Sequence, residues 1–305
     1  MKLFNPIKYL LALLIVITPI NNSIPASASR TTAGKRSIPL VMVPGTHANQ
    51  NRFDATFHKL KVPRQNVLKL TITTNNQIVE RGTYNPANPI VIISFERPDE
   101  YNIHEQANWL AHALIYLKRV YGLNNYNYVG HSNGGLVMLD YLEHPHSTLS
   151  PKLKQLITIG TPYNDIYKTA RTNTQNVKPD QLNDQNKYSY EFKTYYSKRG
   201  QIARSIQVTL IYGHIPHANG DGIVALNSAK AGQTIFGTHV IHMTQVDGTY
   251  SQHSQLPTSS NVIATIGKLI SPDHAILLFN QHLAHSWYVK RLDLRYATKS
   301  NSLTV

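Results

Sequence analysis

The chain has 305 residues, a formal net charge of +14 and no cysteine. Hydrophobic residues make up 41% of it and charged residues 15%, a composition that is typical of a globular protein and excludes a disordered polyelectrolyte, a collagen-like repeat and a polytopic membrane protein. The absence of cysteine excludes disulfide scaffolds, thiolate metal sites, iron–sulfur clusters and a cysteine nucleophile. Catalysis by this chain must therefore use hydroxyl, carboxylate or imidazole groups.

The amino terminus has the pattern of an export signal. Two lysines precede an apolar run over residues 9–20, and the small residues Ala26-Ser27-Ala28 follow it, as signal peptidase requires. We therefore expect residues 1–28 to be a signal peptide cleaved near Ala28, and residues 29–36 to form a basic amino-terminal segment. A retained membrane anchor is the alternative, but the apolar run is shorter than the roughly 20 residues of a spanning helix. The mature protein is then secreted or held at the cell surface.

The positive charge predicts contact with anionic polymers or lipids of a cell envelope. Nucleic acid is the other anionic partner to consider. Lysine and arginine are scattered singly or in pairs, as in Lys35-Arg36 and Lys118-Arg119, and no nucleic-acid-binding motif surrounds them. We expect no specific binding to nucleic acid, and the sequence leaves the oligomeric state open.

Strand and helix patterns alternate along residues 37–270, which predicts one α/β domain. The predicted strands in the first part of this domain are apolar or rich in β-branched residues, and they cover residues 38–43, 67–74, 77–84 and 89–95. The second and third of these strands are expected to pair as a hairpin. Apolar residues at helical spacing predict a helix over residues 103–121, ended by Gly122.

Residues 125–142 join a strand, a tight turn and a helix. The turn is Gly130-His131-Ser132-Asn133-Gly134-Gly135, and the helix is predicted from Leu136. Strand, Gly-x-Ser-x-Gly and helix in this order form the nucleophile elbow, in which Gly130 and Gly134 leave room for the neighbouring strand and helix. A glycine-rich turn with an unreactive serine is the alternative. We expect Ser132 to be a nucleophile, with Gly130 and Gly134 as structural residues of the elbow.

An elbow serine needs backbone donors for the oxyanion. One donor is expected to be the amide of Asn133, directly after the nucleophile. The other should come from the loop after the first strand, Val43-Pro44-Gly45-Thr46-His47-Ala48, where Gly45 lets backbone approach the substrate. We expect the Thr46 amide to be this second donor.

The acid and the base should follow the serine in chain order, on loops after late strands. Strand patterns cover residues 206–213 and 239–246, and a helix is predicted over residues 259–270. Asp221 lies between two glycines after the first of these strands and fits an orienting acid, although an aspartate of an ordinary turn is the alternative. Among 15 histidines, only His253 lies on the loop between the last strand and the last helix, which is the expected place of the general base.

These loops resemble the α/β-hydrolase superfamily. Four segments are similar to exported Gram-positive cell-surface hydrolases of unknown specificity, which are related to lipases and esterases: residues 130–135, 158–164, 221–224 and 253–256. The resemblance implies a mostly parallel, twisted central sheet with helices on both faces and a cap insertion. It also implies a triad of Ser132, His253 and Asp221. Pro44 departs from the family, which often has histidine at that position of the oxyanion loop.

Two further segments each allow two interpretations. Residues 163–205 are polar and rich in tyrosine, and in this architecture an insertion at that point forms a cap whose tyrosines could line a substrate channel; a polar connector is the alternative. Residues 271–305 form a carboxy-terminal extension, read as added helix and strand or as a segment that docks on anionic lipid.

The predicted function is a secreted or cell-surface serine hydrolase that cleaves a small-molecule or lipid-like carboxylic ester through an acyl-enzyme. The alternatives are an acyltransferase or peptidase on the same triad, or an inactive surface-binding protein. The substrate-binding residues are not predicted. No cofactor and no metal ion are expected, because the two His-x-x-His pairs, at residues 214–217 and 239–242, have no third ligand in register.

Overall fold

The computed structural model describes residues 37–144, 147–164 and 188–270. The predicted signal peptide, the basic segment 29–36 and the extension 271–305 lie outside the described residues, as do residues 165–187 of the predicted cap. Within the described ranges, no helix has the length and apolar character needed to cross a membrane.

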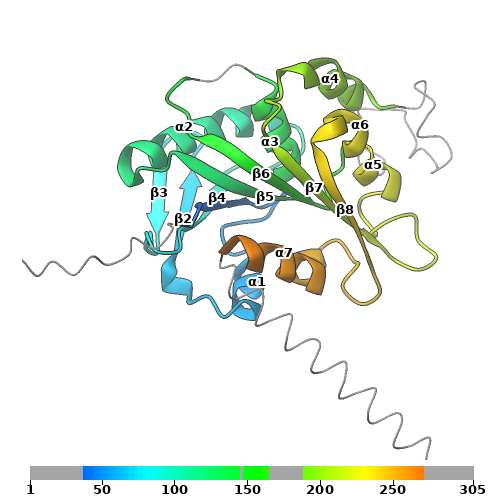
Figure 1. Ribbon diagram of the computed structural model, residues 1–305, viewed down its shortest axis with the longest axis horizontal. Coiled ribbons are helices and arrows are strands. Elements are labelled where there is room, and N and C mark those ends of the chain that lie inside the picture. The colour runs from blue at the N-terminus through cyan, green and yellow to red at the C-terminus, as the bar shows by residue number, and fades with distance from the viewer. Residues whose placement is uncertain (1–36, 145–146, 165–187, 271–305) are drawn as a thin grey trace, which may run out of the picture. The chain divides into compact units, whose positions relative to one another are not determined.

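One sheet of eight strands runs through the domain in the order β3-β2-β4-β1-β5-β6-β7-β8 (Figure 1). Every neighbouring pair is parallel except the hairpin β2–β3. The predicted mostly parallel sheet and the predicted hairpin are therefore confirmed. The strands are β1 (Leu40–Val43), β2 (Val67–Ile72), β3 (Ile78–Arg81), β4 (Ile90–Phe95), β5 (Asn125–His131), β6 (Lys152–Ile159), β7 (Gln207–His214) and β8 (Val240–Asp247).

Helices cover both faces of the sheet (Figure 1). On one face lie α2 (Ile103–Tyr121), α3 (Asn133–Leu142), α4 (Tyr190–Lys198) and α6 (Gly232–Phe236); on the other lie α1 (Asp54–Lys59) and α7 (Ser260–Ile270). The short helix α5 (Leu226–Lys230) follows the β7 loop. Short 3₁₀ turns occur at Arg64–Asn66, Arg199–Gln201, Gly237–His239 and Leu256–Thr258.

The sequence of the central strand β1 is apolar at every position because both of its faces are buried. Val41 and Val43 pack in the core beneath α2 and α3, whereas Leu40 and Met42 pack in the core beside α1 and α7. A parallel strand with helices on both faces has no solvent side, so its sequence does not alternate.

Helix α2 begins and ends where the apolar spacing predicts. Its buried stripe includes Leu110, Leu114 and Leu117, and each of these side chains is 0% exposed. Gly122 ends the helix with φ of 69°, a left-handed conformation that costs glycine little. Helix α3 begins at Asn133, three residues before its predicted start, because the turn at Ser132 leads directly into the first helical residue.

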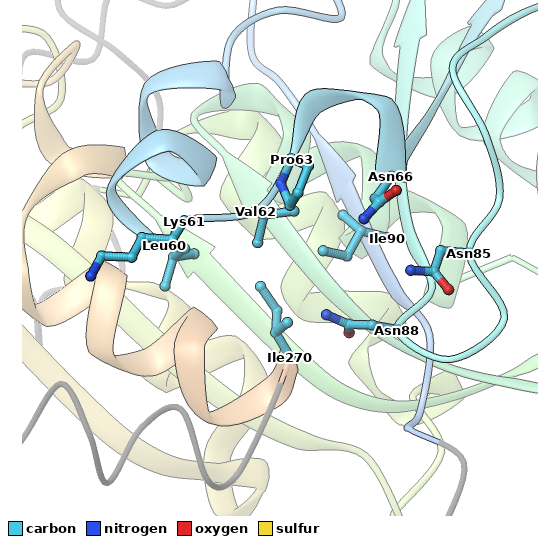
Figure 2. Close-up of a pocket in the computed structure, with 9 residues that line it drawn as sticks. All are labelled: Leu60, Lys61, Val62, Pro63, Asn66, Asn85, Asn88, Ile90 and Ile270. Atoms are coloured by element: carbon cyan, nitrogen blue, oxygen red, sulfur yellow. The ribbon is translucent and has the colours of Figure 1, made fainter.

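A cavity of about 130 Å³ lies near the end of α7. Figure 2 shows Val62, Ile90 and Ile270 grouped around it. Ile90 is the first residue of β4, so the cavity lies at the amino ends of the parallel strands. Ligands of open α/β sheets bind at the carboxyl ends of the strands, and the cavity is therefore at the wrong edge for the predicted chemistry.

Candidate active site

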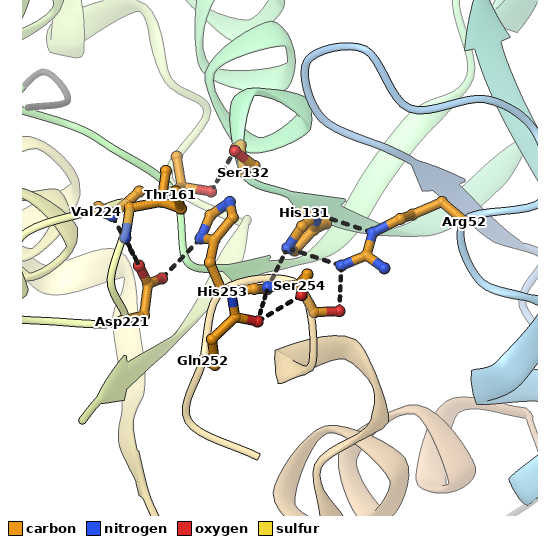
Figure 3. Close-up of polar contacts among 10 residues, drawn as sticks. Arg52, His131, Ser132, Thr161, Asp221, Val224, Gln252, His253 and Ser254 are labelled. Carbon is orange, nitrogen blue, oxygen red and sulfur yellow. Dashed lines mark hydrogen bonds and ion pairs between the residues drawn. The ribbon is translucent and has the colours of Figure 1, made fainter. Parts of the chain in front are cut away.

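The three predicted catalytic side chains follow the carboxyl ends of three parallel strands. Ser132 follows β5, Asp221 lies on the loop after β7, and His253 lies on the loop after β8. Parallel strands end at the same edge of a sheet, and so these loops meet although Ser132 and His253 are far apart in sequence. Figure 3 shows the His253 ring between Ser132 and Asp221.

Ser132 has the strained backbone of an elbow. Its φ is 55° and its ψ is −129°, in a region that L-residues rarely adopt. Two hydrogen bonds hold this turn: Ser132 N–H donates to Ile159 O at 2.8 Å, and Thr161 Oγ1 donates to Ser132 O at 2.9 Å. The Ser132 residue is 8% exposed, so the strain places a nearly buried hydroxyl at the edge of the sheet.

Gly130 and Gly134 leave the space that the elbow needs. A Cβ at Gly130 would lie 2.6 Å from the carbonyl carbon of Gly134, and one at Gly134 would lie 2.3 Å from Val43 O. Both contacts are with backbone, which cannot rotate away as a side chain can. A side chain at either position would therefore displace backbone of the turn or of β1.

Asp221 and His253 form a buried, hydrogen-bonded pair. His253 Nδ1 lies 2.7 Å from Asp221 Oδ2, and the amides of Ile223 and Val224 donate to Asp221 Oδ1 at 3.0 and 2.7 Å. A backbone bond from His253 N to Asp221 O, at 2.9 Å, joins the two loops. Asp221 is 1% exposed, so its carboxylate is held by these donors and fixes the orientation of the imidazole.

The loop after β1 passes directly beside Ser132. A Cβ at Gly45 would lie 2.5 Å from Ser132 Cβ and 3.1 Å from Ser132 Oγ. Asn133 Nδ2 donates to Thr46 Oγ1, which ties together the two residues predicted to supply the oxyanion donors. Within the described ranges, neither the Thr46 amide nor the Asn133 amide donates to a protein acceptor. Two backbone donors are thus available near the serine.

His131 and Arg52 support the His253 loop, and the sequence did not reveal this. His131 Nε2 donates to the backbone oxygen of His253 at 3.0 Å, and Arg52 Nε donates to His131 Nδ1 at 3.4 Å. Arg52 also donates to Ser254 O at 2.7 Å (Figure 3). Burial, and then the charges of His253 and Arg52, lower the pKa of His131 well below its ordinary value, which keeps the ring neutral.

The tyrosines of the predicted cap differ in burial where the structure describes them, and Tyr190, for example, is 75% exposed. Tyr163, Tyr188 and Tyr195 belong to the core on the α2 and α3 face of the sheet. Tyr163, for example, donates from its hydroxyl to Thr158 Oγ1 at 3.0 Å and is 1% exposed. Tyrosine buries its ring readily when its hydroxyl has a partner, and composition alone does not distinguish this from a binding surface.

Among the described residues, one group of side chains brings metal-ligating atoms together: His104, Asp140 and His144. Asp140 lies near the carboxyl end of α3, at the opposite end of that helix from Ser132. The group is therefore separate from the catalytic loops.

Comparison with protein families gives one match to most of the chain. A family model described as alpha/beta hydrolase of unknown function (DUF915) matches residues 27–271. No curated protein matches the sequence significantly.

Two solved structures share the fold along almost their whole length. A protein from Lactobacillus plantarum WCFS1, provisionally assigned as a cell surface hydrolase, is 30% identical with a TM-score of 0.62, and the alignment covers 81% of this chain and 98% of that one. The product of the gene lin2722 from Listeria innocua is 21% identical with a TM-score of 0.64, and the alignment covers 77% and 94% of the two chains.

Proposed function

This chain belongs to the DUF915 family of α/β hydrolases, and we propose that it is a serine hydrolase that cleaves carboxylic esters through an acyl-enzyme. The observation that carries the proposal is the buried pair of His253 and Asp221, joined at 2.7 Å at the edge of the sheet where Ser132 occupies its strained turn. A hydroxyl on an elbow, an imidazole and an orienting carboxylate are the parts that nucleophilic catalysis needs.

In the proposed reaction, Ser132 Oγ attacks the acyl carbon while the free nitrogen of His253 takes its proton. Asp221 holds the imidazole through Nδ1 and stabilises the positive charge that develops on the ring. The amides of Thr46 and Asn133 receive the oxyanion. The alcohol leaves with the proton from His253, and water, activated by the same ring, then releases the acid from Ser132.

Substitution of the nucleophile tests this proposal. We expect Ser132→Ala to reduce hydrolysis of chromogenic esters to background without changing the far-ultraviolet circular dichroism spectrum, because its small side chain fits the same turn. Ser197→Ala is the matched control, since the Ser197 hydroxyl only donates to a backbone oxygen on the exposed side of α4. Ester turnover by Ser132→Ala at the wild-type rate would refute the assignment.

A series of esters with increasing acyl length identifies the substrate class.

A fluorophosphonate probe, which reacts with activated serines, tests whether Ser132 is activated. We expect the probe to label the wild type and Ser197→Ala but not Ser132→Ala. Labelling without ester hydrolysis, together with product formation on an added alcohol or amine, would favour acyl transfer. A wild-type protein that is neither labelled nor active would favour an inactive binding protein.

We also propose that the protein is exported, with residues 1–28 as its signal. The amino-terminal pattern supports this, as does the similarity to the Lactobacillus plantarum protein provisionally assigned as a cell surface hydrolase. Amino-terminal sequencing of the protein recovered from the medium or cell surface is expected to begin near residue 29. A chain that begins at Met1 would refute cleavage.

A further inference from the structure

His104, Asp140 and His144 converge on one point between α2 and α3. His104 Nδ1 lies 2.8 Å from Asp140 Oδ1, and His144 Nδ1 lies 3.2 Å from the same oxygen. One ligand atom from each residue lies within 4.8 Å of the others. Zinc binds imidazole nitrogen and carboxylate oxygen at about 2.0–2.2 Å. Two ligand atoms on one ion are therefore at most about 4 Å apart, so a small adjustment of these side chains would let all three reach one ion.

The ends of the two helices produce this arrangement. Asp140 lies in the last turn of α3, and His144 lies just beyond the helix end, where the turn after Leu142 brings its ring back to Asp140. His104 is the second residue of α2, which packs against α3. The third side chain therefore comes from a segment 36 residues away from Asp140, where no short sequence motif could include it.

The exposure of the three side chains suits an ion that enters from solvent. The Asp140 side chain is 12% exposed, that of His144 is 27% exposed and that of His104 is 61% exposed. The carboxylate thus lies at the base of the cluster, and His104 lies at its open side. An ion would replace two hydrogen-bond contacts, that of His104 Nδ1 with Asp140 Oδ1 at 2.8 Å and that of His144 Nδ1 with the Asp140 backbone oxygen at 2.7 Å.

A second carboxylate lies on the same turn of the chain. Glu143 is 3% exposed, and neither of its carboxylate oxygens has a hydrogen-bond partner in the part of the chain that the structure describes. Buried carboxylates are normally paired or bound to metal. The nearby cation is Lys198, whose Nζ lies 3.0 Å from His144 Nε2. Asp140 and Glu143 thus place two carboxyl groups near one lysine.

We propose that His104, Asp140 and His144 bind a divalent transition-metal ion of the zinc class, which joins α2 to α3. Two imidazoles and one carboxylate favour zinc and its neighbours over magnesium and calcium, which prefer oxygen ligands alone. The site is independent of the proposed ester hydrolysis. It differs from the expectation of no metal site, which considered only histidine pairs close together in sequence.

Removal of His104 tests the site with little risk to the fold, because this side chain is largely exposed. Full-length protein is freed of metal with EDTA and titrated with Zn²⁺ by calorimetry. We expect the His104→Ala protein to bind one equivalent fewer, or to bind that equivalent at least tenfold more weakly, than the wild type. His112→Ala is the matched control, since His112 is an exposed histidine on the same helix and should leave binding unchanged.

Two further measurements separate a built site from ordinary histidine binding elsewhere on the chain. Zn²⁺ should raise the melting temperature of the wild type and of His112→Ala more than that of His104→Ala, because a ligand of the folded state stabilises it. Lys198→Met should bind Zn²⁺ more tightly than the wild type, because it removes the ammonium beside His144. Equal stoichiometry, affinity and thermal shift in all four proteins would overturn the proposal.

Discussion

Gly45 occupies a position where only a hydrogen atom fits. A methyl group there would lie 2.5 Å from Ser132 Cβ, so either Ser132 or the loop after β1 must move. We expect Gly45→Ala to lower kcat for ester hydrolysis at least tenfold, and to cost about 1–3 kcal/mol of stability as an overpacked site does.

Gly200→Ala is the control for Gly45→Ala. A Cβ at Gly200 would meet no atom within 4 Å, so this variant should keep full activity and unfold at the same denaturant concentration or a higher one. Steady-state kinetics and urea unfolding of both variants check the comparison. Wild-type kcat in Gly45→Ala would contradict the close approach of the loop to the serine.

Glu143 makes the free energy of unfolding depend on pH, because its pKa is raised in the folded protein. Burial, and then the charge of Asp140, raise the pKa of Glu143 to about 8, while Lys198 opposes the shift. Between its unfolded pKa of roughly 4.3 and this value, the folded state holds a proton that the unfolded state has lost. The free energy of unfolding therefore falls as pH rises through this interval and changes no further above it.

Glu143→Gln should remove this dependence in metal-free protein. The amide keeps the size of the side chain but carries no charge at any pH. We expect its melting temperature to match the wild type near pH 4.5 and to exceed it increasingly up to pH 8, as measured by calorimetry in the presence of EDTA. A gain that is the same at pH 4.5 and pH 8 would contradict the raised pKa.

At the residue scale, sequence reasoning could select a residue where that residue has a fixed place in a motif. Ser132 lies in Gly-x-Ser-x-Gly, and Asp221 and His253 were selected by their position after late strands; the structure joins the latter two by a hydrogen bond. Arg52 had no such signal. It contacts His131 across 79 residues and Ser254 across 202, and only the folded chain shows that these residues meet.

At the element scale, the segment around α1 holds the loop that carries His253. Arg52 donates to Ser254 O at 2.7 Å, Thr56 Oγ1 donates to Pro257 O at 2.8 Å, and Lys59 Nζ donates to Thr258 O at 2.8 Å. Three side chains along one short segment thus fix the backbone of residues 254–258. The position of the imidazole depends on this contact as well as on Asp221.

Arg52→Ala should loosen the loop that carries His253, because Arg52 donates to the backbone of the next residue, Ser254. We expect kcat to fall about tenfold with a smaller change in KM, since a displaced base costs transition-state stabilisation more than substrate binding. Arg64→Ala is the control, because the Arg64 side chain is 79% exposed and its ion pair with Asp54 spans 3.6 Å. Equal kinetic effects of the two substitutions would argue against a positioning role for Arg52.

Long elements were predicted well and short ones poorly. Helix α2 matches its predicted range of 103–121 because 19 residues display several turns of apolar spacing. Helices α5 and α6 have five residues each, which is too short for a periodic pattern to be visible. Strand β6 was also missed, because exposed lysines at 152 and 154 interrupt the first half of its apolar run.

At the scale of the whole molecule, the sequence predicted the fold class and the family resemblance, and both are confirmed. It did not predict the order of the strands. The first strand lies between β4 and β5 rather than at an edge, and this order depends on crossover connections that hydrophobic patterns do not encode. The predicted catalytic residues could be located without this order, because parallel strands present their carboxyl ends at one edge in any arrangement.

The net charge of +14 predicts reversible attraction to anionic surfaces. We expect the protein to sediment with vesicles that contain anionic lipid at about 0.05 M salt and to be released at about 0.5 M, because salt screens exposed charges. Vesicles of zwitterionic lipid alone are the control and should retain little protein. Retention on both kinds of vesicle that does not respond to salt would indicate apolar insertion instead.

The residues of the proposed site are far apart along the chain, so the site is complete only late in folding. The loop with Gly45 forms beside the first strand, whereas Asp221 and His253 follow β7 and β8, and His131 meets His253 across 122 residues. Contacts between such distant segments close slowly, because a long loop must be ordered before they form. A chain folded only as far as β6 would hold Ser132 without His253, its proposed base. The proposed hydrolytic activity would therefore appear only when the last strand has joined the sheet, and it would serve as a direct measure of complete folding.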